Sequence, residues 1–491
     1  MKKILLSALS MFICAVMLFS CTPADQPAPN GTDDTTASTP VETGPAIDGS
    51  LVAVTTANSE ATIADLSFFF NGIYASDKAQ YGSYLSLLGL DTSKPLNQQA
   101  YGTGTWFDYY LNAGLLQMKS NLLFAEYAKR NGIELTPEEE EEEKQYLEDV
   151  RALVDSQGIT MDEFLKNYYG SLVDEAVFEK CHGLQVIALK AYGEFLASLN
   201  YTDEMYEDGY AKNKGEIDCV DYYRYTVASN VPEDATEEEA EAIKAALKED
   251  LEKLSGAESL EEFEAAFAEE IKKRYTGDEE LTEEKLKSEM SSYLMQESAL
   301  SNLINLGFSE DEEIAAGKSA LTENYNQYTL VYVVSDPKRD ESDTVSMRYI
   351  LLTPAVYETE EEATQKAEEI IAEYTSGEKT GESFGALVKQ YSEDKYTKDS
   401  GGLTEGLRKI DLSDEEVVEW LFDDTRKEGD TAILQCSSGL LIVRFEGESG
   451  PAWKNSLRSL MQSDDYLAEL DRLAEEFEYT ENADVIAQYY A

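Results

Sequence analysis

Hydrophobic residues recur along this chain at several different spacings, and each spacing predicts a different kind of element. Between residues 53 and 205 they recur every three or four positions, which is the period of an amphipathic helix. The clearest stripe consists of Leu111, Leu115, Met118, Leu122 and Ala125. A lobe built mainly of helices is therefore predicted for residues 53–205.

The spacing changes in residues 344–447, where apolar runs rich in strand formers lie at both ends. The opening run is 345–352 and the closing run is 437–445. Between them lie a helical pattern and a polar loop that ends in Gly401-Gly402, a pair that permits positive φ. Strand, helices, loop, helix and strand in this order predict a compact α+β domain.

Residues 206–340 show a similar order of elements. Strand-like runs at 217–227 and 328–334 enclose a helical pattern, and Arg224-Tyr225 parallels Arg348-Tyr349 of the second domain. This stretch lacks the glycine pair and carries an acidic, helical insertion around residues 278–297. We interpret it as a diverged copy of the α+β domain; an unrelated α+β domain is the alternative.

The first residues have the features of a targeting segment. Lys2 and Lys3 precede an apolar run that is too short for a permanent membrane span, and the run ends at Cys21 in the manner of a bacterial lipobox. We predict a lipoprotein signal peptide at 1–21, with Cys21 lipidated. An ordinary secretory signal with an incidental cysteine is the alternative.

Residues 22–52 are rich in Pro, Thr, Asp and Ala, which predicts a disordered tether.

The charge balance excludes one class of partner. The chain has 40 basic and 98 acidic residues, for a net charge of −58. Nucleic acid is therefore a poor partner, because binding to phosphates requires a basic surface. The acidity indicates a solvated surface; the alternative is that it attracts basic or unfolded cationic polypeptides.

Cofactor chemistry has little support in the sequence. His182 is the single histidine, and no two cysteines have the C-x-x-C spacing of redox or zinc motifs. A lone histidine beside a cysteine on a helical stretch is more often a packing or surface residue than a ligand. We expect neither a metal nor a cofactor.

Several short motifs of the second α+β domain resemble those of one family. They are Tyr391-Ser392 before an acidic residue, Gly401-Gly402-Leu403, Trp420-Leu421-Phe422, Gly429-Asp430, and the closing strand at Gly439. The domain resembles the parvulin-type (PpiC, rotamase) peptidyl-prolyl isomerases, and the whole chain resembles PrsA/SurA-type extracytoplasmic foldases. The resemblance implies an α+β fold class with a helical chaperone lobe, one clear parvulin-like domain and one diverged copy.

A C-terminal helix completes the predicted organisation. Residues 453–477 carry one apolar face made of Leu460, Leu467, Leu470, Ala474 and Phe477. In the family, such a tail rejoins the chaperone lobe, so the resemblance implies the same for residues 448–491.

The resemblance also identifies candidate site residues. The family's acidic or cysteine position falls on Asp394. Its first histidine position falls on Tyr349 and its second on Leu441; in the first copy these positions fall on Tyr225 and near Thr329. Both histidines are therefore replaced in both copies. The proline pocket falls on Leu412, Val417 and Phe422, beside Leu441.

The predicted function is that of a lipid-anchored folding factor at the outer face of a bacterial cell membrane. It would bind unfolded or proline-containing segments of client polypeptides, with weak or no isomerase activity because the imidazoles are missing. Tyr349 and Asp394 are the candidate catalytic residues.

An active isomerase remains an alternative, because a phenol can still donate a hydrogen bond. A non-catalytic ligand-binding or structural envelope lipoprotein is the second alternative. The sequence names neither the clients nor an oligomeric state.

Overall fold

The computed structural model describes residues 47–490, apart from 233, 276–279, 310–312, 325–326, 358 and 399. The chain divides into two compact units. The helical unit contains residues up to Asn200 together with Met461–Ala491, and the second unit contains Tyr201–Leu460. The predicted signal peptide with Cys21, and most of the predicted tether, lie outside the described residues.

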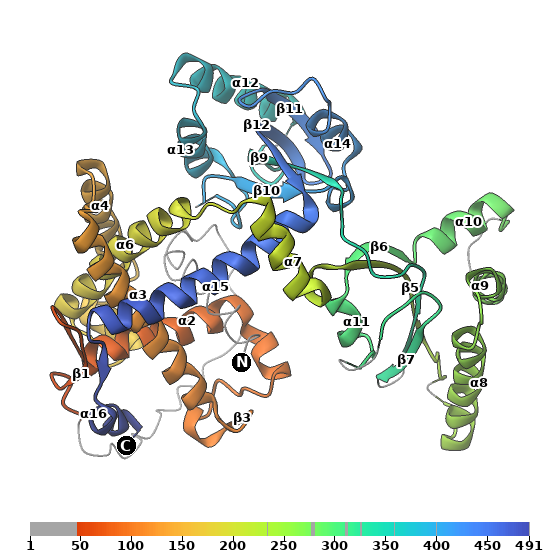
Figure 1. Ribbon diagram of the computed structural model, residues 1–491, viewed down its shortest axis with the longest axis horizontal. Helices are drawn as coiled ribbons and strands as arrows, with labels where there is room; N and C mark the ends of the chain where they lie inside the picture. The colour runs from red at the N-terminus through yellow and green to blue at the C-terminus, as the bar shows by residue number, and fades with distance from the viewer. Residues whose placement is uncertain are drawn as a thin grey trace. The chain divides into compact units, whose positions relative to one another are not determined.

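Helices form most of the helical unit (Figure 1). They are α2 (Ile63–Leu87), α3 (Trp106–Asn131), α4 (Pro137–Ser156), α5 (Met161–Tyr169), α6 (Glu175–Ser198), the later part of α15 (Ala452–Glu476), and α16 (Ala483–Ile486), with short 3-10 turns η1 (Leu96–Gln98) and η3 (Ala487–Tyr490). A threonine begins each of α2, α3, α4 and α5 with a capping box, in which the threonine and the residue three positions on satisfy each other's backbone amides. Local sequence therefore fixes where these helices start.

The C-terminal part of the chain contributes to the core of the helical unit. Tyr466, Leu470 and Leu473 of α15, with Phe477 just after it, are buried in one cluster with residues of α3 and α6. Within this cluster Phe124 stacks on Tyr466, with ring centroids 5.8 Å apart. Residues far apart in sequence thus share one hydrophobic core.

The helical unit also contains small sheets that the helical pattern did not predict. β1 (Val52–Thr55) pairs with β2 (Glu60–Thr62) and with β13 (Thr480–Glu481), so the two ends of the described chain meet in one three-stranded sheet. β3 (Ala100–Tyr101) and β4 (Gly104–Thr105) form a hairpin. Such short strands carry too few residues for their period to be visible in the sequence.

The second unit begins with α7 (Asp203–Ile217) and contains two α+β modules. The first module (residues 219–333) consists of β5 (Cys219–Ala228), α8 (Glu237–Ser255), α9 (Leu260–Arg274), α10 (Glu283–Ser291), β6 (Leu294–Ala299), α11 (Ser301–Asn305), β7 (Ser319–Asn324) and β8 (Gln327–Val333). Its antiparallel sheet has the order β6-β5-β8-β7.

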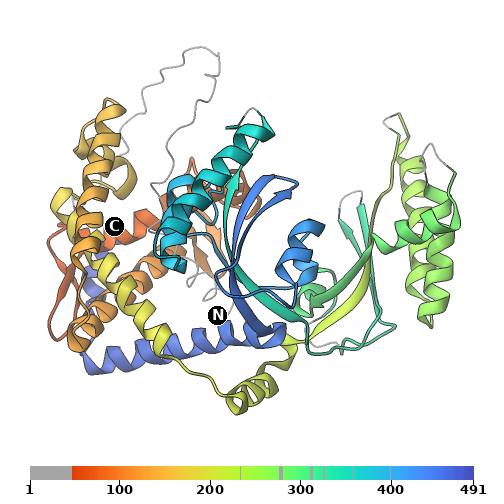
Figure 2. The ribbon, with the colours of Figure 1, turned by 90° about the horizontal axis from the view of Figure 1, so that it is seen from above.

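The second module (residues 343–451) consists of β9 (Asp343–Leu352), α12 (Glu360–Ser376), α13 (Gly381–Tyr391), β10 (Leu403–Leu407), η2 (Lys409–Asp411), α14 (Glu415–Leu421), β11 (Thr431–Cys436) and β12 (Gly439–Pro451). Its sheet has the order β10-β9-β12-β11. Helices α12 and α13 cover one face of this sheet, and α14 covers the other (Figure 2).

The two modules have the same topology. In each, the first and last strands form the central antiparallel pair, and the second and third strands flank them. Residues 278–297, which the sequence predicts to be an insertion, are one only in part. Helix α10 is extra, but β6, which begins at Leu294, is the counterpart of β10.

No helix in the described part of the chain is long and apolar enough to cross a membrane.

Candidate functional site in the second module

The register of the central strands places two of the predicted site residues on one face. Tyr349 lies opposite Val443 and Leu351 lies opposite Leu441. Because side chains alternate between the faces of a strand, Tyr349 and Leu441 are diagonal neighbours on the same face. That face is the one covered by α14, not by α12 and α13.

A polar loop runs beside β9 and brings in the acidic residue. The Ser392 hydroxyl accepts a hydrogen bond from the Leu351 amide (3.2 Å), and the Glu393 amide donates to the Leu351 carbonyl (2.9 Å). At the other end of the loop, the Tyr349 amide donates to the Gly402 carbonyl (3.2 Å). These bonds hold the loop residue Asp394 next to Tyr349.

The glycine pair is required by this close approach. Gly401 and Gly402 have φ of +68° and +71°, and a Cβ at Gly402 would lie 2.5 Å from the Tyr349 carbonyl oxygen. The guanidinium of Arg348 donates to the Gly401 carbonyl (2.9 Å) and lies beside the carboxylate of Glu446 (3.3 Å). This ion pair lies on the face covered by α12 and α13, and it fixes the end of the loop.

The centre of the site is a hydrogen bond from the Tyr349 hydroxyl to the Asp394 carboxylate. Asp394 also accepts from the Thr397 hydroxyl (2.8 Å) and from the Tyr396 amide (3.0 Å). Burial, strengthened by the bond to Asp394, raises the pKa of Tyr349 to about 12. Burial alone would raise the pKa of Asp394, but the hydrogen bonds it accepts outweigh burial and hold that pKa below its ordinary value. The pair is thus a neutral phenol donating to an ionised carboxylate.

Apolar side chains surround this pair. Val417 and Leu441 are buried in one cluster, and Tyr349, Leu412 and Phe422 are packed against it, half-buried. The structure therefore brings together all the residues predicted for the site in this module: five share one apolar cluster, and Asp394 is bonded to one of them. The arrangement places an apolar surface beside a polar pair whose two members are already bonded to each other.

Sequence reasoning missed two residues of this site. Thr397 shares the Asp394 carboxylate with Tyr349, and its position three residues after an aspartate was an available turn signal. Cys436, at the end of β11, packs against the same apolar cluster, and burial raises the pKa of its thiol. No local pattern places this cysteine near Tyr349, because only the β11–β12 hairpin brings it there.

Among its described residues, the first module has no equivalent of the Tyr349–Asp394 pair, and one predicted equivalence was wrong. Tyr225 is buried with helices α8 and α9, whereas Tyr349 lies on the face opposite the corresponding helices. A shift of one residue moves a side chain to the other face of a strand, so the residue at the position of Tyr349 is Arg224, which is exposed. Thr329 does correspond to Leu441: it pairs with Thr226, as Leu441 pairs with Leu351.

His182 lies in the helical unit and takes no part in this site. It is buried, its Nδ1 lies 2.8 Å from Glu143 Oε1, and its ring stacks on Tyr146 with centroids 4.2 Å apart. In the described part of the chain, no group of three or more His, Cys, Asp or Glu side chains is placed to hold a metal ion.

The second module combines a four-stranded antiparallel sheet that has helices on both faces with a Tyr-Ser-acid loop that leads to a glycine pair beside the first strand, which is the arrangement expected for a parvulin-type domain. Comparison with protein families confirms this class. Residues 328–447 match the PPIC-type PPIASE domain, and the match begins in β8, earlier than the start predicted at 344. The chain therefore carries a PPIC-type peptidyl-prolyl isomerase domain in its C-terminal half.

Solved structures similar to this chain include foldases. PrsA from Bacillus subtilis is 12% identical, with 90% of this chain and 100% of that chain covered and a TM-score of 0.25. The peptidylprolyl isomerase PrsA from Bacillus anthracis is 14% identical, with 59% and 94% covered and a TM-score of 0.20. A SurA-like chaperone of Campylobacter jejuni is 12% identical, with 56% and 91% covered and a TM-score of 0.19. A search of curated proteins gave no match.

Proposed function

We propose that this protein is a lipid-anchored extracytoplasmic folding factor that binds unfolded or proline-containing segments of client polypeptides, with little or no isomerase activity. The observation that carries the proposal is the Tyr349–Asp394 hydrogen bond inside the apolar cluster of the second module. A parvulin-type domain supports the binding of client segments, and the pairing of its polar groups argues against catalysis.

Rotation about a prolyl bond has a barrier near 20 kcal/mol because of amide resonance. An enzyme lowers this barrier by removing water from the amide and by stabilising the twisted form with hydrogen bonds. In this module the Tyr349 phenol already donates to Asp394, and Leu441 offers no polar atom. The apolar surface that remains favours holding a client over turning its prolyl bond.

A protease-coupled prolyl-peptide assay on the chain from Cys21 onward tests the catalytic part of the proposal. The native protein should show turnover close to background. Tyr349→His combined with Leu441→His should raise turnover on the order of ten-fold or more, because it restores imidazoles beside Asp394. Tyr396→His is the matched control, since it adds an imidazole at an exposed position of the same loop.

One result would overturn this part of the proposal. If the native protein turns over the peptide and Asp394→Ala abolishes that turnover, the site is catalytic, with the phenol of Tyr349 acting as a donor. The protein would then be an active isomerase.

Client binding needs a separate test. The native protein should suppress the aggregation of an unfolded client, followed by light scattering, at stoichiometric concentrations. Complete failure to suppress aggregation would favour a ligand-binding or structural envelope lipoprotein instead.

Attachment to a membrane through Cys21 is the last part of the proposal. The lipobox-like end of the targeting segment supports it, and several acyl chains would give stable anchoring. Cys21→Ser should release the protein from the membrane fraction, and mass spectrometry should find diacylglycerol on the native N-terminal peptide. A soluble native protein with an unmodified Cys21 would contradict it.

A further inference from the structure

The helical unit contains a cavity of about 270 Å³ that is lined mainly by aromatic rings. Its walls come from α2, α3, α4, α5, α6 and the β3 hairpin. The aromatic lining residues are Phe68, Phe69, Tyr81, Tyr84, Tyr101, Trp106, Tyr109, Tyr146 and Tyr169. The volume is just below the usual range for ligand pockets, about 300–1,000 Å³, so the cavity suits a small molecule.

One carboxylate lies in this aromatic lining without a counter-charge. Of the described residues that line the cavity, Asp77 on α2 is the single acidic one, and none is a lysine or an arginine. Among its described neighbours, the half-buried Asp77 accepts one hydrogen bond, from the Tyr110 hydroxyl at 3.2 Å. Burial raises the pKa of Asp77, and the bond from Tyr110 opposes this only in part. A bound cation would offset the cost of holding a carboxylate at this place.

His182 is the remaining lining residue that can carry a positive charge, and it has a carboxylate of its own. Its Nδ1 lies 2.8 Å from Glu143 Oε1, and its ring stacks on Tyr146. The charge on Asp77 is therefore left for a ligand to balance.

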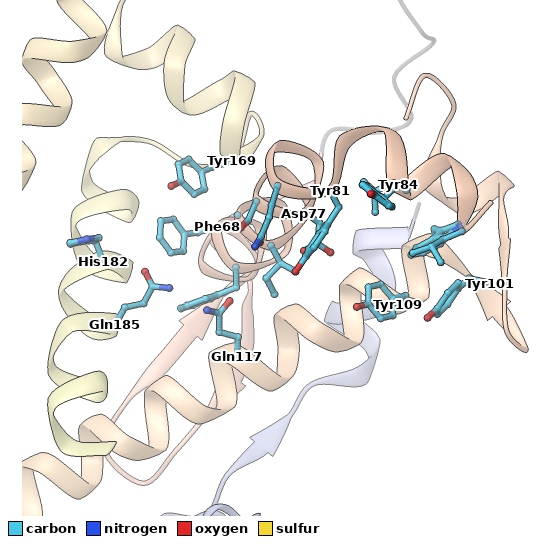
Figure 3. A pocket seen from close by; sticks show the side chains of 18 of the residues that line it. Phe68, Asp77, Tyr81, Tyr84, Tyr101, Tyr109, Gln117, Tyr169, His182 and Gln185 are labelled. Atoms are coloured by element: carbon cyan, nitrogen blue, oxygen red, sulfur yellow. The ribbon is translucent and has the colours of Figure 1, made fainter. Parts of the chain in front are cut away.

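Aromatic rings surround the outer end of the cavity, next to Asp77. Tyr81 follows Asp77 by one turn of α2, and Tyr84, which is 68% exposed, lies at the mouth. Tyr101 of β3 and Tyr109 of α3 lie across the cavity from them (Figure 3). The ring centroids of Tyr101 and Tyr109 are 5.0 Å apart, with an angle of 63° between the planes, so these two rings form a corner. Aromatic rings attract a cation that lies over their faces within about 6 Å of the centroid.

Two glutamine side chains reach the inner end of the cavity. Gln117 on α3 and Gln185 on α6 are 9% and 8% exposed, and Figure 3 shows both amides pointing into the pocket. Within the described residues, neither side chain has a hydrogen-bond partner. Because an amide offers both a donor and an acceptor, a hydroxyl group can pair with either of them. The inner end therefore suits an uncharged polar group.

The lining favours one class of ligand over others. A phosphate or a fatty acid would bring a second negative charge near Asp77, with no lysine or arginine to balance it. A primary ammonium group would bring three N–H donors against walls that are mostly ring carbon. A quaternary ammonium group needs no hydrogen bonds, and its methyl groups pack against ring faces. The net charge of −58 also raises the concentration of cations around the protein.

We propose that this cavity binds a small, free quaternary-ammonium compound that carries a hydroxyl group, which is the chemistry of choline. The Asp77 carboxylate is the counter-charge, the four tyrosines of the outer end enclose the ammonium group, and the two glutamines hydrogen-bond to the hydroxyl. The inference goes beyond the proposed function, because it concerns a small molecule and depends neither on client polypeptides nor on the second module.

Isothermal titration calorimetry of choline into the chain from Cys21 onward tests the role of the charge. Asp77→Asn keeps the shape of the side chain and an acceptor for Tyr110, and it should weaken binding by about ten-fold or more. Asp155→Asn, at an exposed position of α4, is the matched control: it makes the same change of charge in the same unit and should leave binding unchanged. The neutral isostere of choline, in which a tert-butyl group replaces the trimethylammonium group, should bind the native protein about ten-fold more weakly.

Further variants separate the rings from the glutamines. Tyr84→Leu removes a ring at an exposed position and should weaken binding of both choline and tetramethylammonium by about two- to five-fold, whereas Tyr84→Phe keeps the ring and should have little effect. Gln117→Leu with Gln185→Leu should weaken choline binding by about two- to ten-fold and leave tetramethylammonium, which has no hydroxyl, unchanged. Equal weakening of both cations by the glutamine variant would contradict the role given to the glutamines.

Thermal unfolding distinguishes a misfolded variant from the loss of the site. Choline should raise the thermal midpoint of the native protein and of Asp155→Asn but not that of Asp77→Asn. Without choline, the midpoint of Asp77→Asn should equal or exceed the native value, because a carboxylate without a counter-charge has been removed.

Phosphocholine distinguishes a free cation from a lipid headgroup. It should bind about ten-fold more weakly than choline, because its phosphate has no counter-charge in the cavity. The proposal is overturned if the native protein binds neither choline nor tetramethylammonium at millimolar concentration, or if it binds the neutral isostere or phosphocholine as tightly as choline. Native affinity of Asp77→Asn for choline would also overturn it. None of these outcomes bears on the suppression of aggregation, which tests the proposed function separately.

Discussion

The two α+β modules of this protein have the same scaffold but different surfaces. Both have the strand order 2-1-4-3, and in both a pair of helices covers one face of the sheet. On the other face, the second module carries Tyr349 bonded to Asp394, whereas the first carries the exposed Arg224 at the same position. The two modules therefore share a topology, whereas the bonded Tyr349–Asp394 pair belongs to the second module. A common fold does not by itself imply a common site.

The shared scaffold predicts equal losses from equivalent core substitutions, and this is the largest effect expected. Phe263 of α9 and Phe384 of α13 are both fully buried under their sheets. Replacement of either by Ala should destabilise its own module by about 3–5 kcal/mol, through lost transfer energy and the cavity left behind. Hydrogen exchange followed by mass spectrometry on the full chain measures each module. Loss of protection in both modules from one substitution would show that they unfold as one body.

The glycine pair distinguishes the modules, and its substitution is the next largest effect. Gly402→Ala should destabilise the second module by about 2–4 kcal/mol, because Cβ meets the Tyr349 carbonyl and the residue has positive φ. Gly429→Ala is the control: its φ of +89° is also positive, but a Cβ there meets only the Arg444 guanidinium at 3.6 Å, an ordinary contact, so it should cost only about 1–2 kcal/mol. Denaturant unfolding compares the two. Equal costs would mean that the loop does not need this close approach.

The hydroxyl of Tyr349 should stabilise the second module by a smaller amount. Tyr349→Phe removes the donor to an ionised carboxylate and should cost about 1–2 kcal/mol, since Asp394 keeps its bonds from Thr397 and the Tyr396 amide. Tyr225→Phe should change the stability of the first module by less than about 0.5 kcal/mol, because its hydroxyl has no partner among the described residues. Similar costs for both substitutions would contradict this difference between the modules.

The effect of Tyr349→Phe should also depend on pH. The pKa of Tyr349 is raised to about 12, against about 10 in an unfolded chain. A raised pKa means that the folded state keeps the phenol protonated, so its contribution is complete below about pH 10 and is lost as the pH rises towards 12. The lowered pKa of Asp394 has the opposite sense: its contribution is present above about pH 4 and is lost as the pH falls further.

Denaturant unfolding followed by the fluorescence of Trp420, which packs against the same cluster, measures this dependence. The difference in stability between native protein and Tyr349→Phe should be constant from pH 7 to 9 and shrink above pH 10. A difference that stays constant to pH 12 would show that the phenol is not held neutral by the fold.

Arg224→Ala should have the smallest effect. The side chain is exposed, so the change in stability of the first module should lie within about 0.5 kcal/mol, and client binding at the second module should be unaffected. Hydrogen exchange of β5 checks the first expectation. A larger loss would mean that the face of the first module opposite α8 and α9 has a structural role of its own.

The sequence by itself determined the periodic elements, the order of elements in both modules, and the candidates at Tyr349, Asp394 and Leu441. These are local properties, set by side-chain period, helix caps and the glycines that a close turn requires. Tertiary structure alone decided that Tyr225 faces the helices and that Thr397 shares the carboxylate of Asp394. The reason is physical. A strand shows which side chains share a face, but only packing decides which face is buried and which distant residues it meets.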